Sequence, residues 1–217
     1  RSRGGSVYLD GGKLLLENVD LENSDSTAVF VENLEQVEAK NSVFKNCKGT
    51  DGGAFHTNMV DKLFFSDLSF RNNQAENSGG AVYLKISPKE GCLIQDSYFY
   101  NNSAVTGGGL SGVDVSLNLT RCFFESNNAS DIGGGASLTC PLDSSCKSHI
   151  RDSNFTLNSA STQGGSLKWD HSRPSFTNLL FQNNSAAYGA DMASFPVSMS
   201  PQTSSSTRLL VSYIGEI

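Results

Sequence analysis

The run Trp169-Asp170-His171-Ser172-Arg173 is the richest cluster of polar side chains in the sequence. It holds the single tryptophan and one of the three histidines, and an indole ring flanked by charged groups could form a platform on which a sugar stacks. The same run also fits a plain surface loop between two repeats, and we favour that interpretation. The other two histidines, His56 and His149, are isolated, so we expect them at the surface or in turns rather than as metal ligands.

The acidic residues do not form the clusters that catalysis needs. Asp51, Glu76 and Asp131 each precede a glycine pair, but the corresponding segments Val105-Thr106 and Thr162-Gln163 carry no acid. Calcium binding and paired acid–base catalysis both require carboxylates that converge. The sequence also lacks a nucleophile elbow, a phosphate-binding loop, an HExxH motif and an EF-hand loop. We therefore expect a non-enzymatic protein with no catalytic residue, no metal site and no cofactor.

The elements that hold these residues must be built from an unusual composition. The 217 residues include 33 Ser, 19 Asn, 21 Gly and 13 Phe, whereas hydrophobic residues make up 37% and charged residues 18%. Low charge together with many aromatic rings argues against a disordered chain. The net charge of −6 argues against nucleic-acid binding, which needs a basic face. No apolar run reaches the roughly 20 residues of a membrane helix, so we expect no membrane insertion by this segment.

A repeat with a period of 22 to 30 residues organises the chain. The residue after each glycine pair, or after its equivalent, marks one copy, and the markers are Ser6, Ala28, Ala54, Ala81, Leu110, Ala136, Ser166 and Asp191. A phenylalanine stands 10 to 12 residues before each of the last six markers, at Phe44, Phe70, Phe99, Phe124, Phe155 and Phe181. Three residues after it stands an asparagine in five copies, at Asn73, Asn102, Asn127, Asn158 and Asn184, with Cys47 in the first copy. The unit reads F-x-x-N-x-A, a short turn, GGA and a short apolar strand.

This unit predicts an all-β fold, a parallel β-helix (solenoid) of about eight coils over residues 1–197. Residues 198–217 would form a C-terminal extension. Equivalent residues of successive coils stack about 4.8 Å apart, so the phenylalanines would form an internal aromatic stack and the asparagines an amide ladder. Glycines before each strand allow a sharp bend or a positive φ. Helical repeats are excluded because no 3.6-residue apolar stripe runs through any unit.

The repeat resembles that of the polymorphic outer membrane proteins, first known from chlamydial surface proteins and also found in protist and algal surface proteins. That family carries F-x-x-N followed by GGA-[ILV]. Phe70-Arg71-Asn72-Asn73 with Gly79-Gly80-Ala81-Val82 fits the pattern, as does Phe99-Tyr100-Asn101-Asn102 with Gly108-Gly109-Leu110. The resemblance covers roughly residues 41–195. It implies a right-handed parallel β-helix at a cell surface, used for adhesion or as a structural coat, and it brings no catalytic residues.

The cysteines favour an extracellular or cell-surface location, where the sequons of the chain could carry glycans. Cys140 and Cys146 close a short loop and are expected to form a disulfide, which needs an oxidising compartment. Spacing does not pair Cys47, Cys92 or Cys122. Five N-x-S/T sequons occur, and none of them uses a ladder asparagine: Asn101, Asn118, Asn128, Asn154 and Asn183. In a eukaryotic secreted protein, we expect N-linked glycans on several of these side chains.

Three functions remain open at this point. The favoured one is a structural subunit of a surface fibre or coat that assembles head to tail into a homopolymer, because unpaired strands at both ends of a solenoid can stack. An assembly strand formed by Leu209, Leu210, Val211, Tyr213 and Ile214 would add to a neighbouring subunit, or this segment would begin another domain. The alternative is the β-helical stalk or passenger of a cell-surface adhesin. A polysaccharide-active β-helix enzyme is the least favoured.

Overall fold

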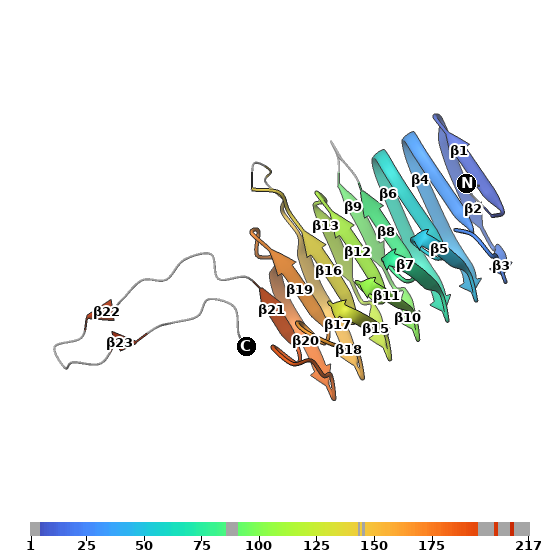
Figure 1. Cartoon of the computed structure of the whole chain (residues 1–217). Coiled ribbons are helices and arrows are strands. Elements are labelled where there is room, and N and C mark those ends of the chain that lie inside the picture. Colours follow the sequence, from blue (N-terminus) through green and yellow to red (C-terminus); the bar gives the residue numbers. More distant parts are fainter. Residues whose placement is uncertain are drawn as a thin grey trace.

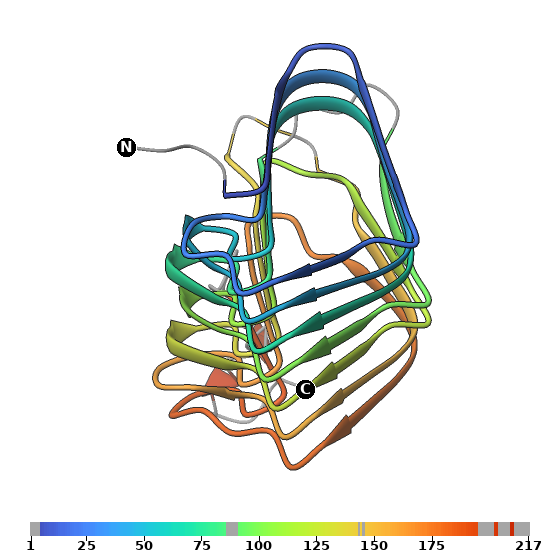
Figure 2. The same cartoon turned by 90° about the vertical axis from the view of Figure 1, so that its right-hand side faces the viewer.

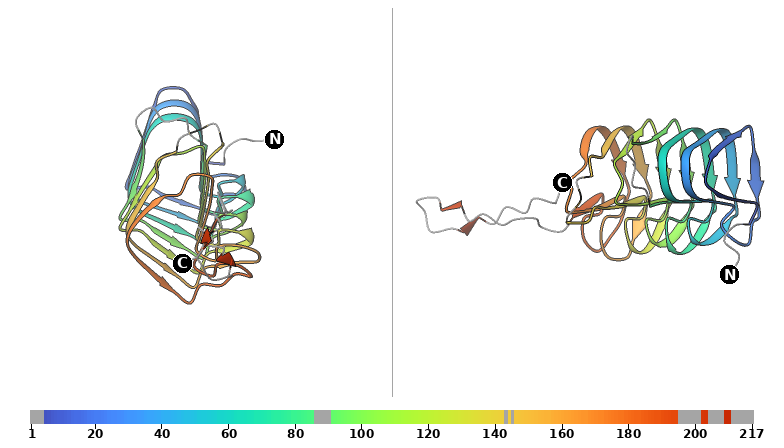
Figure 3. Two further views of the ribbon diagram at one scale, coloured as in Figure 1. Left: turned by 90° about the vertical axis from the view of Figure 1, so that its left-hand side faces the viewer. Right: turned by 90° about the horizontal axis from the view of Figure 1, so that it is seen from above.

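The chain folds into a parallel β-solenoid of about seven turns (Figure 1). The computed structural model describes residues 5–85, 91–142, 144 and 146–194, and the backbone of 202–203 and 209–210. Within the solenoid all strand pairs are parallel, and seen from above the coils follow one another in a row (Figure 3). The predicted all-β parallel β-helix is confirmed. The eight markers bound seven turns rather than eight coils, because the last marker only opens a strand. No helix of the described residues is long and apolar enough to cross a bilayer.

The turns form three long faces, and five of the connections between the third and the first face form a short separate sheet, which lies to one side of the coil in Figure 2. The first face, after each glycine pair, contains β1 (Val7–Asp10), the beginnings of β4 (Val29–Lys45) and β6 (Phe55–Arg71), β8 (Val82–Lys85), β12 (Leu110–Val113), β16 (Ala136–Thr139), β19 (Leu167–Asp170) and β21 (Met192–Ser194). The second face contains β2 (Lys13–Glu17), the middles of β4 and β6, β9 (Cys92–Gln95), β13 (Leu117–Thr120) and the beginnings of β17 (His149–Thr156) and β20 (Ser175–Gln182).

The third face carries the phenylalanine of each repeat. It contains β3 (Asp20–Glu22), the ends of β4, β6, β17 and β20, β10 (Tyr98–Tyr100) and β14 (Phe123–Glu125). The short sheet contains β5 (Lys48–Asp51), β7 (Gln74–Ser78), β11 (Ser103–Thr106), β15 (Asn128–Ile132) and β18 (Ser159–Ala160). β4 and β6 are each 17 residues long and run without a break through all three long faces.

The repeated phenylalanines form one stack inside the third face. Successive ring centroids from Phe44 to Phe181 lie 4.4 to 5.4 Å apart, and their planes are inclined by 3° to 24°. The first five rings are buried, while Phe181 in the last turn is half-buried. Stacked rings of this kind fill the coil with apolar area, which is the main favourable term in folding.

The repeated asparagines form a buried ladder beside the phenylalanine stack. The Nδ2 atom of Asn73 donates to Oδ1 of Asn102 at 3.0 Å, and the same bond links Asn102 to Asn127, Asn127 to Asn158 and Asn158 to Asn184. Each Oδ1 also accepts the backbone N–H of the ladder residue in the preceding coil, at 2.9 to 3.0 Å. Each Nδ2 donates once more to the preceding coil, to a phenylalanine carbonyl, at 2.9 to 3.1 Å. One amide therefore satisfies backbone groups that water cannot reach.

The two positions of each glycine pair require glycine for different steric reasons. Gly79 has a φ of +64°, which side-chain-bearing residues adopt only at a cost. At Gly80 the constraint is space, since an added Cβ would lie 2.1 Å from the carbonyl oxygen of Gly108 in the next coil. The bend into each first-face strand thus requires one glycine for its backbone conformation and a second for the close approach of the coils.

The strand pairing at the two glycine triplets differs from the predicted register by one residue. Val82 aligns with Leu110, and Leu110 aligns with Ala136, so the third glycine of each triplet takes the place that Ala81 holds. The markers at Leu110 and Ala136 were therefore one position late. In the true register the turn from residue 135 to 166 spans 31 residues, one more than the predicted maximum, and it contains the loop closed by the Cys140–Cys146 disulfide.

The C-terminal segment is described only in two short strands. β22 (Gln202–Thr203) pairs antiparallel with β23 (Leu209–Leu210), so Leu209 and Leu210 of the predicted assembly strand pair within their own chain. Val211, Tyr213 and Ile214 lie outside the described residues. Addition of this strand to a neighbouring subunit stays a prediction.

Replacing a central ladder residue by Asn127→Ala should destabilise the solenoid by about 3 kcal/mol or more. The change leaves the Phe99 carbonyl and the amide groups of Asn102 without their partners in a buried site. The matched control is Asn128→Ala, because that side chain is exposed, and its effect should stay within about 0.5 kcal/mol. Urea unfolding followed by circular dichroism measures both. Equal midpoints for the two variants would contradict a stabilising ladder.

Candidate binding groove

Four ring side chains form a row on the outer surface of the first face. Strand register aligns Tyr8, Phe30, His56 and Tyr83, each of which lies between two inward-facing residues of its strand. The ring centroids of Phe30 and His56 lie 4.3 Å apart with planes inclined by 10°, and those of His56 and Tyr83 lie 4.9 Å apart. Tyr8 lies 5.9 Å from Phe30 and donates a hydrogen bond from its hydroxyl to Glu32. The first four coils thus present a continuous aromatic row to the outside.

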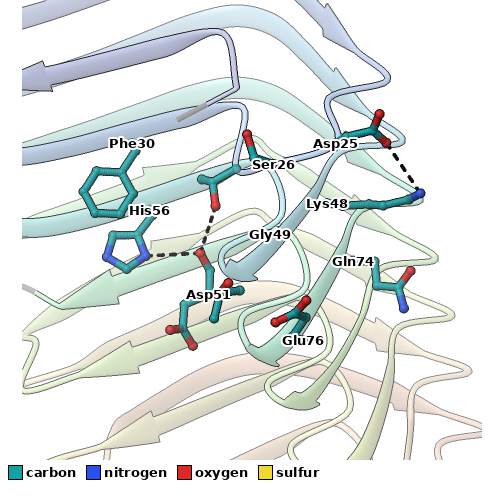
Figure 4. Close-up of a pocket in the computed structure, with 11 residues that line it drawn as sticks. Asp25, Ser26, Phe30, Lys48, Gly49, Asp51, His56, Gln74 and Glu76 are labelled. Atoms are coloured by element: carbon teal, nitrogen blue, oxygen red, sulfur yellow. Dashed lines mark hydrogen bonds and ion pairs between the residues drawn. The ribbon is translucent and has the colours of Figure 1, made fainter. Parts of the chain in front are cut away.

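A groove of about 860 Å³ lies between this aromatic row and the short sheet. Phe30 and His56 lie side by side at one side of it, and β5, β7 and the turn before β4 line the rest (Figure 4). The polar lining residues are Asp25, Ser26, Thr27, Lys48, Thr50, Asp51, Gln74 and Glu76. The glycine pair Gly52-Gly53 connects β5 to β6, so the short sheet and the first face meet at this groove.

The charges of the groove are mainly negative. The Lys48 ammonium lies 3.7 Å from the Asp25 carboxylate and offsets that charge. Within the part of the chain that the structure describes, the carboxylates of Asp51 and Glu76 form no ion pair. Two carboxylates therefore remain uncompensated beside the aromatic row.

His56 adds a further hydrogen-bond acceptor to the groove. Its Nδ1 lies 3.1 Å from the carbonyl oxygen of Asp51, and because a carbonyl only accepts, Nδ1 carries the proton. Burial lowers the pKa of His56, since it disfavours the charged imidazolium more than the nearby Asp51 favours it. At neutral pH the ring is therefore uncharged, and its Nε2 has a lone pair to offer. An aromatic edge, one imidazole nitrogen and two carboxylates make a site for hydrogen-bond donors.

His56 lies at the outer surface, as predicted, but it is not isolated, because it stacks between Phe30 and Tyr83 in an aromatic row that the sequence analysis missed. His56 is half-buried in β6, and Asp51 and Glu76, considered earlier only as possible catalytic acids, line the same groove. A signal was present, because a ring stands two residues after each of the first four markers, at Tyr8, Phe30, His56 and Tyr83. The residue types differ, so a search for identical letters does not find them. The predicted position of His149 is closer, since it is exposed on β17 beside the hydroxyl of Ser175.

The run from Trp169 to Arg173 divides between a strand and a surface turn, and its tryptophan does not form an exposed sugar platform. Trp169 belongs to β19, is 5% exposed, and packs edge-on against Phe176 at 5.4 Å between ring centroids. Alternation along the strand turns Leu167 and Trp169 inward. His171 and Ser172 follow in the turn and contact the loop that the disulfide closes. Nδ1 of His171 lies 3.0 Å from the carbonyl oxygen of Cys140, and Oγ of Ser172 donates to the carbonyl oxygen of Cys146 at 2.6 Å.

Cys140 and Cys146 are joined by a disulfide, with 5.9 Å between their Cα atoms. The Oδ1 atom of Asp114 lies 3.8 Å from Sγ of Cys146, so the loop brings together three residues, one aspartate and two cysteines, whose side chains can bind a metal. The two sulfurs are bonded to each other and offer no thiolate, which is the form that binds a metal. With the disulfide formed, the loop is closed by a covalent bond and offers no cysteine ligand to a metal.

The remaining cysteines are buried thiols. Cys47, Cys92 and Cys122 are all free. Cys47 takes the ladder position in the first repeat copy, and its backbone N–H donates to Oδ1 of Asn73 at 3.0 Å. Burial raises the pKa of all three thiols, and that of Cys122 to about 12. Such thiols are inert, because the thiolate is the reactive form.

The five sequon asparagines differ in exposure. Asn101, Asn118, Asn128 and Asn183 are exposed, whereas Asn154 is half-buried in β17. Asn101 and Asn183 stand directly before ladder asparagines and have φ values of 52° and 53°, a conformation that asparagine tolerates better than most residues. The Nδ2 atom of Asn101 donates to Oδ1 of Asn72 at 2.9 Å on the outside of the coil.

The comparisons with known proteins agree with this construction. Residues 67–85 match the family model described as the Chlamydia polymorphic membrane protein repeat, and this segment contains Phe70, Asn73 and the pair Gly79-Gly80. This parallel β-solenoid therefore carries, at residues 67–85, a repeat similar to that of the polymorphic membrane proteins. Over 92 residues it is 36% identical to the probable outer membrane protein pmp20 of Chlamydia pneumoniae, a match that covers 40% of this chain and 5% of that protein. No solved structure matches the chain.

The native protein should not react with thiol reagents. At about pH 8, iodoacetamide should leave Cys47, Cys92 and Cys122 unmodified for hours, and all three should react after unfolding in guanidinium. A pH of about 10 lies above the pKa of an ordinary thiol. Cys122 should stay protonated even there, because burial raises its pKa to about 12. The variant Ser130→Cys, at an exposed position, should react within minutes and serves as the control. Rapid native labelling of the three thiols, detected by mass spectrometry, would be inconsistent with a closed core.

Secretion from a eukaryotic cell should place N-linked glycans on the exposed sequons. We expect occupancy at Asn118 and Asn128 and less at half-buried Asn154. Glycopeptide mass spectrometry measures this, and Ser130→Ala should remove the glycan of Asn128 alone. Unmodified asparagines at all five sequons would refute the prediction.

Proposed function

We propose that this segment is the β-helical stalk or passenger of a cell-surface adhesin, is located outside the cell, and catalyses no reaction. The observation that carries the proposal is the polymorphic membrane protein repeat at residues 67–85, since its phenylalanine, asparagine and glycine positions are the ones that build the coil. The similarity to an outer membrane protein supports the location.

The arrangement of side chains supports the same function. The repeated phenylalanines and asparagines pack in the core, so a partner would have to bind to outward-facing residues. The groove beside Phe30 and His56 is lined by such residues. A rod of about seven turns is roughly 35 Å long and displays such residues at fixed spacing. The fibre alternative rested on end-to-end stacking and on the strand at Leu209–Leu210, which pairs with β22 of its own chain.

The purified chain should remain monomeric, with the 23.2 kDa mass of one chain in multi-angle light scattering, and should appear as isolated particles in electron microscopy. Beads coated with the folded chain should adhere to cells or to extracellular matrix more than beads coated with the heat-denatured chain. Ordered filaments would favour the fibre subunit instead. Cleavage of polyuronides by the purified protein would contradict both interpretations and favour the enzyme.

A further inference from the structure

The groove beside the aromatic row combines a cavity with unbalanced charge. Its lining holds the three acids Asp25, Asp51 and Glu76 against the single base Lys48, which gives a formal charge of −2 (one minus three). The next charged groups around His56 are Glu32 and Lys85, and these two cancel. The groove therefore stays negative when its surroundings are included, and a cationic ligand would complement it.

The orientation of the rings argues against a neutral sugar. A sugar stacks on the open face of an aromatic ring, but Phe30 and His56 lie face to face at 4.3 Å and cover each other. Tyr8 and Tyr83 lie on the outer sides of this pair, at 5.9 and 4.9 Å. The row therefore presents ring edges to the groove rather than a flat platform. An edge of this kind suits the apolar stem of a long side chain.

These features meet in one ligand chemistry, and the geometry points to a groove that binds a lysine or arginine side chain of a protein partner. The hydrocarbon stem would lie along the edges of Phe30 and His56, and the charged head would donate to the carboxylates of Asp51 and Glu76. His56 Nε2 offers a third acceptor, because Nδ1 is occupied by the Asp51 carbonyl. Arginine, with five donors in a planar fork, can bond to more than one of these acceptors, whereas lysine carries its charge at a single point.

The inference names the kind of partner that the proposed adhesin would hold, and it rests on that proposal only for its biological meaning. The binding chemistry itself belongs to the groove and can be measured on the purified chain. An adhesion assay and a groove-binding assay can therefore succeed or fail independently.

The probe is a fluorescein-labelled nine-residue Gly/Ser peptide with two arginines, and its control carries citrulline at both positions. Fluorescence anisotropy at low ionic strength should show binding of the arginine peptide, with at least tenfold weaker binding of the citrulline peptide. The double variant Asp51→Asn/Glu76→Gln should raise the dissociation constant of the arginine peptide at least tenfold. The matched control Glu35→Gln/Asp131→Asn removes the same charge outside the groove and should change it less than twofold.

The location of binding needs its own readout. The chain has only three histidines, so the ring signals of His56 can be assigned by NMR, and the arginine peptide should shift them without shifting those of His149. Three results would overturn the inference: equal weakening in both double variants, equal affinity for the citrulline peptide, or His56 signals that respond to a neutral oligosaccharide such as cellotetraose but not to the arginine peptide. If the coated beads adhere while the peptide fails, the groove assignment falls and the adhesin proposal stands.

Discussion

The structure depends on one requirement, that every coil satisfy the backbone groups of the next inside a narrow interior. The amide of each ladder asparagine does this, since Asn127 bonds to Asn158, to the Phe99 carbonyl and to the amide groups of Asn102. No other uncharged side chain except glutamine offers two donors and an acceptor on one planar group. The phenylalanine stack keeps water away from these bonds, and that exclusion makes an unsatisfied group there costly.

This requirement separates the residues that build the coil from those that face outward. Inside, phenylalanine, asparagine and the glycine pair are fixed by stacking and by backbone contacts such as Gly80 to Gly108. Outside, the same register places each residue beside its counterpart in the next coil, so outward residues at equivalent positions line up in rows. An outward row can change its chemistry without any cost to the core, and binding properties can therefore vary along one scaffold.

The same separation determines what could be predicted from the sequence. The fold class, the ladder and the phenylalanine stack were predictable, because stacking repeats identical residues at identical positions. The register failed at the glycine triplets, where three identical letters leave the alignment ambiguous until the pairing of Val82 with Leu110 resolves it. Trp169 was misassigned because its neighbours in the sequence are polar, while its orientation follows from strand parity. The groove could not be predicted from repeated residue types, because the aromatic row beside it consists of Tyr, Phe and His rather than one repeated residue.

Register also shows how far the aromatic row beside the groove extends. The aromatic row ends at Tyr83, and the next positions in line are Ser111 and Ser137, both buried. The αL glycine lies close to the row in both kinds of coil, since a Cβ added to Gly79 would stand 3.0 Å from the backbone nitrogen of Tyr83 and one added to Gly107 would stand 3.0 Å from Cβ of Ser111. The side chain at this one position of each coil, a ring or a serine, therefore decides how far the aromatic row extends along the rod.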